Sequence, residues 1–262
     1  MSAARQTDDR GGPPRQEDGA RLSHVQRHED VRSMTMSYRI IQNGESRSFQ
    51  GGHAFVEAAR DDAAARVYID SKAATAFVRD IGGGWNPADA PFVLVELGHE
   101  CLAVHTGDSA SADQRGKAAP NVFGFARFRL GDAEPSRLIE LVKPAQPDES
   151  ALARAKQAFE DAGFVVAVCG DFPGRIVDRL VRPYYNAALR RLDEKLATAS
   201  DLDTTLRLGL GYPEGPIALL ERTGLSHHYR VTQALYEALG DSAYAPARRA
   251  QVAYQRMEGG ER

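Results

Sequence analysis

Short apolar runs alternate with amphipathic stretches over the first two thirds of the chain. Six runs have the length and composition of buried strands, and they cover 38–41, 66–70, 92–97, 122–128, 138–142 and 164–169. Leu102 to His105 is a further strand candidate. Helical character is predicted for Gly52 to Ala65, Ala73 to Asp80 and Asp148 to Gly163. Strands that alternate with short helices predict a mostly parallel α/β sheet.

Beyond Pro173-Gly174 the pattern predicts helices only. One apolar stripe with spacings of three and four residues predicts a long helix, and it comprises Val177, Val181, Tyr184, Ala188 and Leu192. Pro183 lies inside this stripe and is expected to kink the helix. Ser200, Pro216, Ser226 and Pro246 are expected to begin four further helices.

The predicted organisation has three parts. Residues 1–36 are polar, contain a GGPP cluster and carry charges of both signs, which predicts a disordered tail. Residues 37–170 form the α/β part, and residues 171–262 form the helical part.

Composition excludes several classes of protein. The 262 residues are 42% hydrophobic and carry a formal net charge of −3, which argues against a general nucleic-acid binder. No apolar run approaches the length of a membrane span, and the N-terminus lacks the pattern of a signal peptide. Cys101 and Cys169 are interpreted as buried thiols, and no set of metal ligands is recognisable. We therefore expect a cytoplasmic protein with no metal, no nucleic acid and no membrane partner.

The junction between the two parts carries a family resemblance. Residues 165–178 read VVAVCGDFPGRIVD, residues 200–203 read SDLD, and residues 208–216 read LGLGYPEGP. These elements resemble, in order, the DxPGFIVNRL turn and the DIDxAMxxGxxYPxGP segment of the 3-hydroxyacyl-CoA dehydrogenase family. The resemblance covers about residues 120 to 250. It implies a degenerate Rossmann-like half with a reduced, mostly parallel sheet, followed by an all-helical C-terminal domain that dimerises.

The resemblance also implies a reaction, the NAD-dependent oxidation of a 3-hydroxyacyl-CoA to the 3-ketoacyl-CoA. In the family a histidine takes the hydroxyl proton and a glutamate orients that histidine. Glu140 matches the orienting acid, whereas the histidine position falls on Ala126, or on Phe128 if no insertion is allowed. Neither side chain accepts a proton. His99, which follows the run 92–97, is a candidate substitute base or an exposed loop residue.

The cofactor loop departs from the family as well. A Rossmann protein has G-x-G-x-x-G after its first strand, but here only Gly44 lies near the required place. Asp70 is a candidate ligand of an adenosine ribose or a cap for the residues that follow. Thr106 and Ser109 resemble the SNTSS stretch of the family. Asp178 stands where the family has asparagine near the reacting carbons, and as a first-turn acid it is also favoured by the helix dipole.

Two functions follow from these observations. The first is an NAD-dependent 3-hydroxyacyl-CoA dehydrogenase of fatty-acid or aromatic-acid catabolism with an unusual site. The second is a non-catalytic member that binds acyl-CoA or supports assembly. Either reading implies a homodimer or a complex with a full-length dehydrogenase. By family the chain is an oxidoreductase, whereas the missing histidine and glycine loop indicate impaired or absent activity alone.

Overall fold

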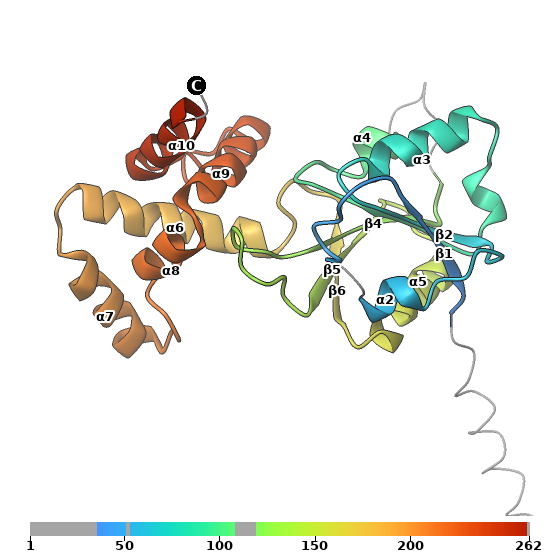
Figure 1. The fold of residues 1–262 in the computed structure, drawn as a ribbon, viewed down its shortest axis with the longest axis horizontal. Coiled ribbons are helices and arrows are strands. Elements are labelled where there is room, and N and C mark those ends of the chain that lie inside the picture. The colour runs from blue at the N-terminus through green and yellow to red at the C-terminus, as the bar shows by residue number, and fades with distance from the viewer. Residues whose placement is uncertain (1–35, 51–52, 108–118, 261–262) are drawn as a thin grey trace, which may run out of the picture. The chain divides into compact units, whose positions relative to one another are not determined.

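Six strands form one sheet in the computed structural model, which describes residues 36–50, 53–107 and 119–260 (Figure 1). Their order in the sheet equals their order in the chain: β1 (Tyr38–Gln42), β2 (Ala65–Ile69), β3 (Val93–Glu96), β4 (Val122–Arg127), β5 (Leu138–Lys143) and β6 (Val165–Gly170). Neighbouring strands are parallel except for β4 and β5, which are antiparallel. The predicted mostly parallel α/β sheet is confirmed.

Both faces of the central strands β2 to β5 are mostly buried, which is why these strands read as largely apolar runs, whereas the edge strands β1 and β6 are more exposed. Along β4, Phe123 and Phe125 belong to one hydrophobic cluster and Val122 to the other. Helix α5 (Glu149–Asp161) packs its Phe159 into the first cluster, and α3 (Ala73–Gly82) packs Phe77 into the second. Figure 1 shows α5 and α3 on opposite sides of the sheet.

Two predicted elements of this part are wrong. The helical stretch Gly52 to Ala65 contains only the single turn α2 (Ala54–Glu57). The strand expected over Leu102 to His105 is the short helix α4 (Ala103–Thr106). The carboxylate of Asp171, far along the chain, accepts hydrogen bonds from the backbone N–H groups of Leu102 and Ala103, both at 2.7 Å. This distant cap satisfies the first turn of α4 and favours a helix there. The remaining short element is a 3-10 turn, η1 (Pro87–Asp89).

The second part of the chain is helical, as predicted. It consists of α6 (Val177–Asp193), α7 (Ala199–Leu210), α8 (Pro216–Thr223), α9 (Leu225–Leu239) and α10 (Arg248–Gly260). Helix α6 runs through Pro183. Because proline has no N–H, the carbonyl of Arg179 loses its helical partner. The Tyr244 hydroxyl donates to that carbonyl at 3.0 Å, so the fold supplies the missing hydrogen bond.

Two predicted helix caps are also wrong. Thr198, not Ser200, caps α7, and its hydroxyl accepts from the Asp201 N–H at 3.1 Å. Helix α9 begins at Leu225 after Gly224, so Ser226 is not its cap. Asp203, which lies in α7, caps the next helix. Its carboxylate accepts from two N–H groups at the start of α8, each at 2.9 Å.

The helices have a hydrophobic cluster of their own, which includes Leu189, Leu220 and Ala250. Leu130, from the loop after β4, also lies in this cluster. The next residue, Gly131, has φ +58°, and a Cβ there would lie 1.5 Å from the carbonyl oxygen of Thr223. Glycine is therefore required where this loop meets α8.

Most of the predicted disordered tail, residues 1–35, lies outside the described residues. Residues 36–262 belong to one compact unit. Among the described helices, none is long and apolar enough to cross a membrane.

Candidate functional site

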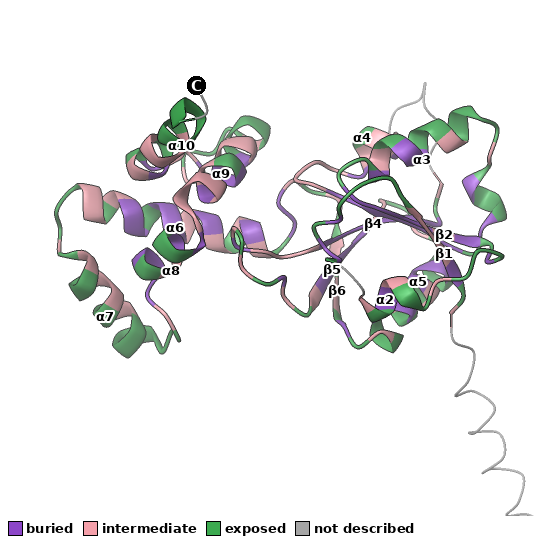
Figure 2. Ribbon diagram, viewed as in Figure 1, coloured by how far each residue is buried: buried purple, intermediate pink, exposed green. Residues whose placement is uncertain are grey.

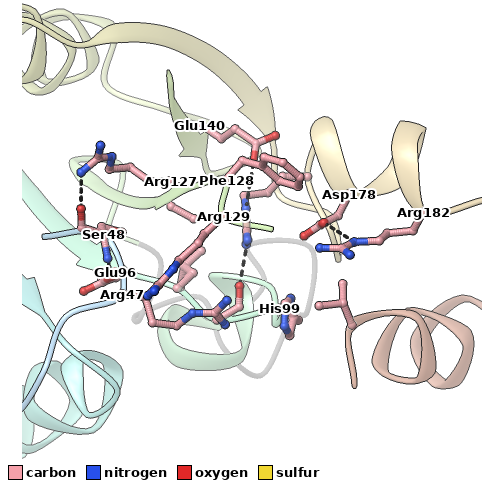
Figure 3. Close-up of a pocket in the computed structure, with 15 residues that line it drawn as sticks. Arg47, Ser48, Glu96, His99, Arg127, Phe128, Arg129, Glu140, Asp178 and Arg182 are labelled. Atoms are coloured by element: carbon pink, nitrogen blue, oxygen red, sulfur yellow. Dashed lines mark hydrogen bonds and ion pairs between the residues drawn. The ribbon is translucent and has the colours of Figure 1, made fainter. Parts of the chain in front are cut away.

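A pocket lies where the carboxyl ends of β3 and β4 face α6 and α9 (Figure 3). It brings together three predicted site residues, Glu140, His99 and Asp178, together with both positions considered for the family histidine, Ala126 and Phe128. The space left between the side chains is about 20 Å³, which is room for about one water molecule. The pocket is therefore filled mainly by its own charged side chains.

Glu140 is buried and fully engaged. One carboxylate oxygen accepts from the N–H groups of Ile176 and Val177, each at 2.8 Å, and the other lies 3.5 Å from Nε of Arg175. Two N–H groups at the start of α6 are thus satisfied by a side chain from the sheet. Glu140 holds the first turn of α6 against β5.

The strand register places Ala126 directly opposite Glu140 in the antiparallel pair of β4 and β5. Residues that pair in this way have side chains on the same face, with Cβ atoms about 4.5–5.5 Å apart. A histidine at position 126 would therefore contact Glu140. Position 126, one of the two positions considered for the family histidine, carries only a methyl group.

Asp178 begins a buried polar chain inside the helical part. Its carboxylate accepts from Nε of Arg182 at 2.8 Å, and Nη1 of Arg182 donates to Nδ1 of His228 at 3.2 Å. His228 Nε2 lies 3.0 Å from the amide oxygen of Asn186, whose nitrogen donates to the Ala243 carbonyl. Arg182 and His228 are each only 1% exposed. The imidazole is neutral in this arrangement, because burial and the adjacent guanidinium lower the pKa of His228 well below its usual value.

We expect the free energy of unfolding to fall as the pH is lowered from 7.5 to 5.5. The folded-state pKa of His228 is depressed, so below about pH 6.5 the unfolded chain binds a proton that the folded chain excludes. The contribution of His228 to the free energy of unfolding is therefore fully present above that pH. Below it, this contribution falls by about 1 kcal/mol per pH unit. Urea unfolding at each pH measures the slope. His228→Gln should make the slope shallower, while the depressed pKa of His99 keeps part of it. An unchanged slope in that variant would contradict this role of His228.

His99 lies in the same pocket, just after β3, and its Nδ1 is buried with no hydrogen-bond partner among the described residues. The pKa of His99 is lowered to about 4, mainly by burial, with the positive charges of Arg47, Arg175 and Arg182 adding to the decrease and Asp178 opposing it. The imidazole is therefore uncharged near neutral pH. It is neither an exposed loop residue nor placed beside Glu140.

The loop that follows β1 decides whether NAD, which the resemblance implies, fits this structure. In a Rossmann protein the N–H groups of this loop and of the helix behind it bind the pyrophosphate. Here two N–H groups of the described part of the loop bind internal carboxylates. Glu96 accepts from the N–H of Ser48 and the hydroxyl of Ser46, each at 2.8 Å, and Asp70 accepts from the N–H of Asn43. The following helix, α2, is a single turn. The loop does not fit a dinucleotide.

The sheet order leads to the same conclusion. A doubly wound sheet has the order 3-2-1-4-5-6, and its dinucleotide lies at the reversal beside strand 1. In the part of the chain that the structure describes, β1 is the edge strand and the order runs from β1 to β6 without reversal. The crevice that would hold the cofactor is therefore missing from the described sheet.

Asp70 and Thr106 lie outside the pocket. The Asp70 carboxylate accepts from the N–H groups of Asn43 and Lys72, which engages it as a cap of the following residues. The Thr106 hydroxyl donates to the Leu102 carbonyl at 3.3 Å, near a different cavity. Ser109 lies outside the described residues. No group of three or more potential metal ligands was found among the residues described.

The sequence did not reveal that arginines dominate the pocket. Five line it: Arg47, Arg127, Arg129, Arg175 and Arg182. Two signals were available. Arg175 stands where the family turn has phenylalanine, and Arg127 and Arg129 flank Phe128 at the end of β4.

Comparison with known proteins identifies the helical part. Residues 174–261 match the family model described as 3-hydroxyacyl-CoA dehydrogenase, C-terminal domain. The helical part of this chain belongs to the 3-hydroxyacyl-CoA dehydrogenase family. A 3-hydroxybutyryl-CoA dehydrogenase of Bradyrhizobium diazoefficiens is 34% identical over 109 residues, which are 42% of this chain and 37% of that protein. The mitochondrial hydroxyacyl-coenzyme A dehydrogenase of Sus scrofa is 37% identical over 89 residues, 34% of this chain and 28% of that protein.

The chain spans only about two fifths of the length of the curated relatives that it matches. Its fold extends further than its sequence similarity. FadB2 of M. tuberculosis superposes with a TM-score of 0.58 at 22% identity, covering 76% of this chain and 67% of that one. The (S)-3-hydroxybutyryl-CoA dehydrogenase of Ralstonia eutropha gives 0.57 at 19% identity, covering 75% and 65%. The predicted Rossmann-like half followed by a helical domain is confirmed.

Proposed function

We propose that this chain is a member of the 3-hydroxyacyl-CoA dehydrogenase family that does not transfer hydride and that assembles, through its helical part, with a second domain of the same kind. The loss of hydride transfer is supported by the loop after β1, whose N–H groups are bound by Glu96 and Asp70. It is supported further by Ala126, which leaves Glu140 no histidine to orient.

The observation that carries the assembly role is the exposure of α7. None of its twelve residues is buried, although the helix is amphipathic (Figure 2). Leu208 is 81% exposed and Leu210 64%, and Tyr212 follows them at 44%. An amphipathic helix whose apolar residues face solvent is typical of an interaction surface. The family resemblance implies dimerisation through the helical domain, so a second such domain is the partner that we propose.

We expect the purified chain to form a homodimer, or a complex with a full-length 3-hydroxybutyryl-CoA dehydrogenase, and Leu208→Glu to weaken it. Burying one leucine contributes about 1.5–3 kcal/mol, and a symmetric dimer buries two, so the dissociation constant should rise at least about a hundredfold. Light scattering over a concentration series measures this, with the dehydrogenase absent or present.

Val104→Glu is the matched control, because Val104 is 72% exposed on α4 in the other part of the chain. It introduces the same charge at a similarly exposed apolar position and should leave assembly unchanged. A strict monomer that also fails to bind the dehydrogenase would contradict the proposal, as would equal weakening by the two variants.

A further inference from the structure

Three of the five arginines in the pocket have no carboxylate partner among the described residues. Arg127 donates to the carbonyls of Ser48, Pro135 and Ser136, and Arg129 donates to those of Asp132 and Ala133. Arg47 makes no hydrogen bond or ion pair within the described ranges and points into the pocket beside Arg129 (Figure 3). The pocket therefore holds guanidinium groups that no carboxylate of the described residues contacts.

The carboxylates of the pocket are already engaged. Glu140 binds Arg175 and the start of α6, Asp178 binds Arg182, and Glu96 accepts from the loop after β1. None of them contacts Arg47 or Arg129 among the hydrogen bonds and ion pairs of the described chain. Arg47 as a residue is exposed to solvent, but the part of it that lies in the pocket is desolvated enough to lower its pKa. Asp178 and Glu96 oppose this decrease, and the charges of Arg129 and Arg175 add to it.

An outer cavity of about 260 Å³ adjoins the pocket and shares Arg47, His99, Arg129 and Val231 with it. From α9 and the loop after β4 it is also lined by His227, Arg230 and Asp132, and Asp132 lies 3.4 Å from His227. This volume is below the range of about 300–1,000 Å³ that is usual for drug-sized ligands. The cavity suits a compact molecule rather than a whole coenzyme A.

Arg175 adds a donor deeper in the pocket. Its side chain is 6% exposed, its Nη2 donates to the Gly98 carbonyl at 2.8 Å, and its Nη1 is buried with no partner in the described chain. A buried guanidinium N–H without an acceptor costs free energy, because the group has lost its hydrogen bonds to water and gained none in the protein. This cost is larger for a charged group than for a neutral one. An acceptor oxygen entering the pocket would satisfy it.

We propose that this arginine pocket binds a small oxyanion, a carboxylate or a phosphate group, between the guanidinium groups of Arg47 and Arg129, with the rest of the molecule in the outer cavity. Guanidinium groups bind both kinds of group in paired hydrogen bonds. His99 lines both cavities as an uncharged imidazole, so the positive charge of the site comes from the arginines. This inference is independent of the proposed assembly, because no residue of α7 takes part in it.

The test is isothermal titration calorimetry of the full chain with inorganic phosphate and, separately, with 3-hydroxybutyrate, at constant ionic strength. The neutral diol 1,3-butanediol is the control ligand. We expect saturable binding of at least one anion and none of the diol. Phosphate alone or carboxylate alone would assign the group that is recognised.

Arg47→Gln should weaken binding by at least about tenfold, because it removes one charge-assisted contact. Arg47 has no partner to lose within the described chain, so this substitution should leave the fold intact, which circular dichroism checks. Arg79→Gln on α3, 66% exposed and outside the pocket, is the matched control and should bind as the unmodified chain does. No binding of either anion, or equal affinity in Arg47→Gln, would overturn the proposal.

Discussion

With NAD and 3-hydroxybutyryl-CoA, we expect the purified chain to form NADH at least about 10²–10⁴ times more slowly than a full-length relative, since a positioned general base contributes that factor alone. Position 126 holds a methyl group opposite Glu140, so no imidazole accepts the hydroxyl proton. In the described part of the loop after β1, the N–H groups of Asn43 and Ser48 already bind carboxylates instead of facing a pyrophosphate, which should lower the rate further. Absorbance of NADH measures the rate, with the relative as positive control.

Ala126→His separates the two causes. The new imidazole would contact Glu140, but the loop would still bind Glu96 and Asp70, so we expect little recovery. An unmodified chain that turns over at an ordinary rate of about 10 per second would contradict this account. His99→Ala would then test the imidazole that lines the pocket, and an unchanged rate in that variant would exclude it as the base.

We expect Asp178→Ala to destabilise the folded chain by about 3–5 kcal/mol, because removing one partner of a buried ion pair leaves the other charge uncompensated. That charge is the guanidinium of Arg182, which is 1% exposed and also bonded to His228. Denaturant unfolding followed by circular dichroism measures the change.

The control for this prediction is Glu214→Ala. It breaks the ion pair between Glu214 and Arg222, whose side chains are 34% and 58% exposed, so the loss should be much smaller than in Asp178→Ala. Equal losses in the two variants would show that the Asp178–Arg182 pair gains nothing from burial.

The sequence predicted the strands well because the central strands are mostly buried on both faces and the runs are predominantly apolar. It failed where a distant side chain decides local structure. Asp171 caps α4 from about 70 positions away, and Glu96 orders the loop that follows β1. Neither contact has a local pattern, so a strand was predicted for α4 and no anchor was recognised for the loop.

For the site, motif spacing found Glu140 and Asp178, and His99 was found by its place after a strand. The structure places all three in one pocket. The arginines were missed because they come from separate elements, from the loop after β1 to α6, and meet only in three dimensions. Asp70 and Thr106 lie outside this pocket. The roles predicted for them, binding of a ribose and of a substrate, stay predictions.

Glu140 is held in place by a folding requirement. Its carboxylate satisfies the first N–H groups of α6, so its loss would leave those groups and Arg175 unpaired whatever chemistry the chain performs. Selection for a folded protein alone would then preserve this glutamate long after its histidine had disappeared. Among proteins descended from such enzymes, we expect the glutamate to be retained more often than the histidine. Its presence in a sequence would then indicate that the helical part packs on the sheet in this way, and not that the protein is catalytic.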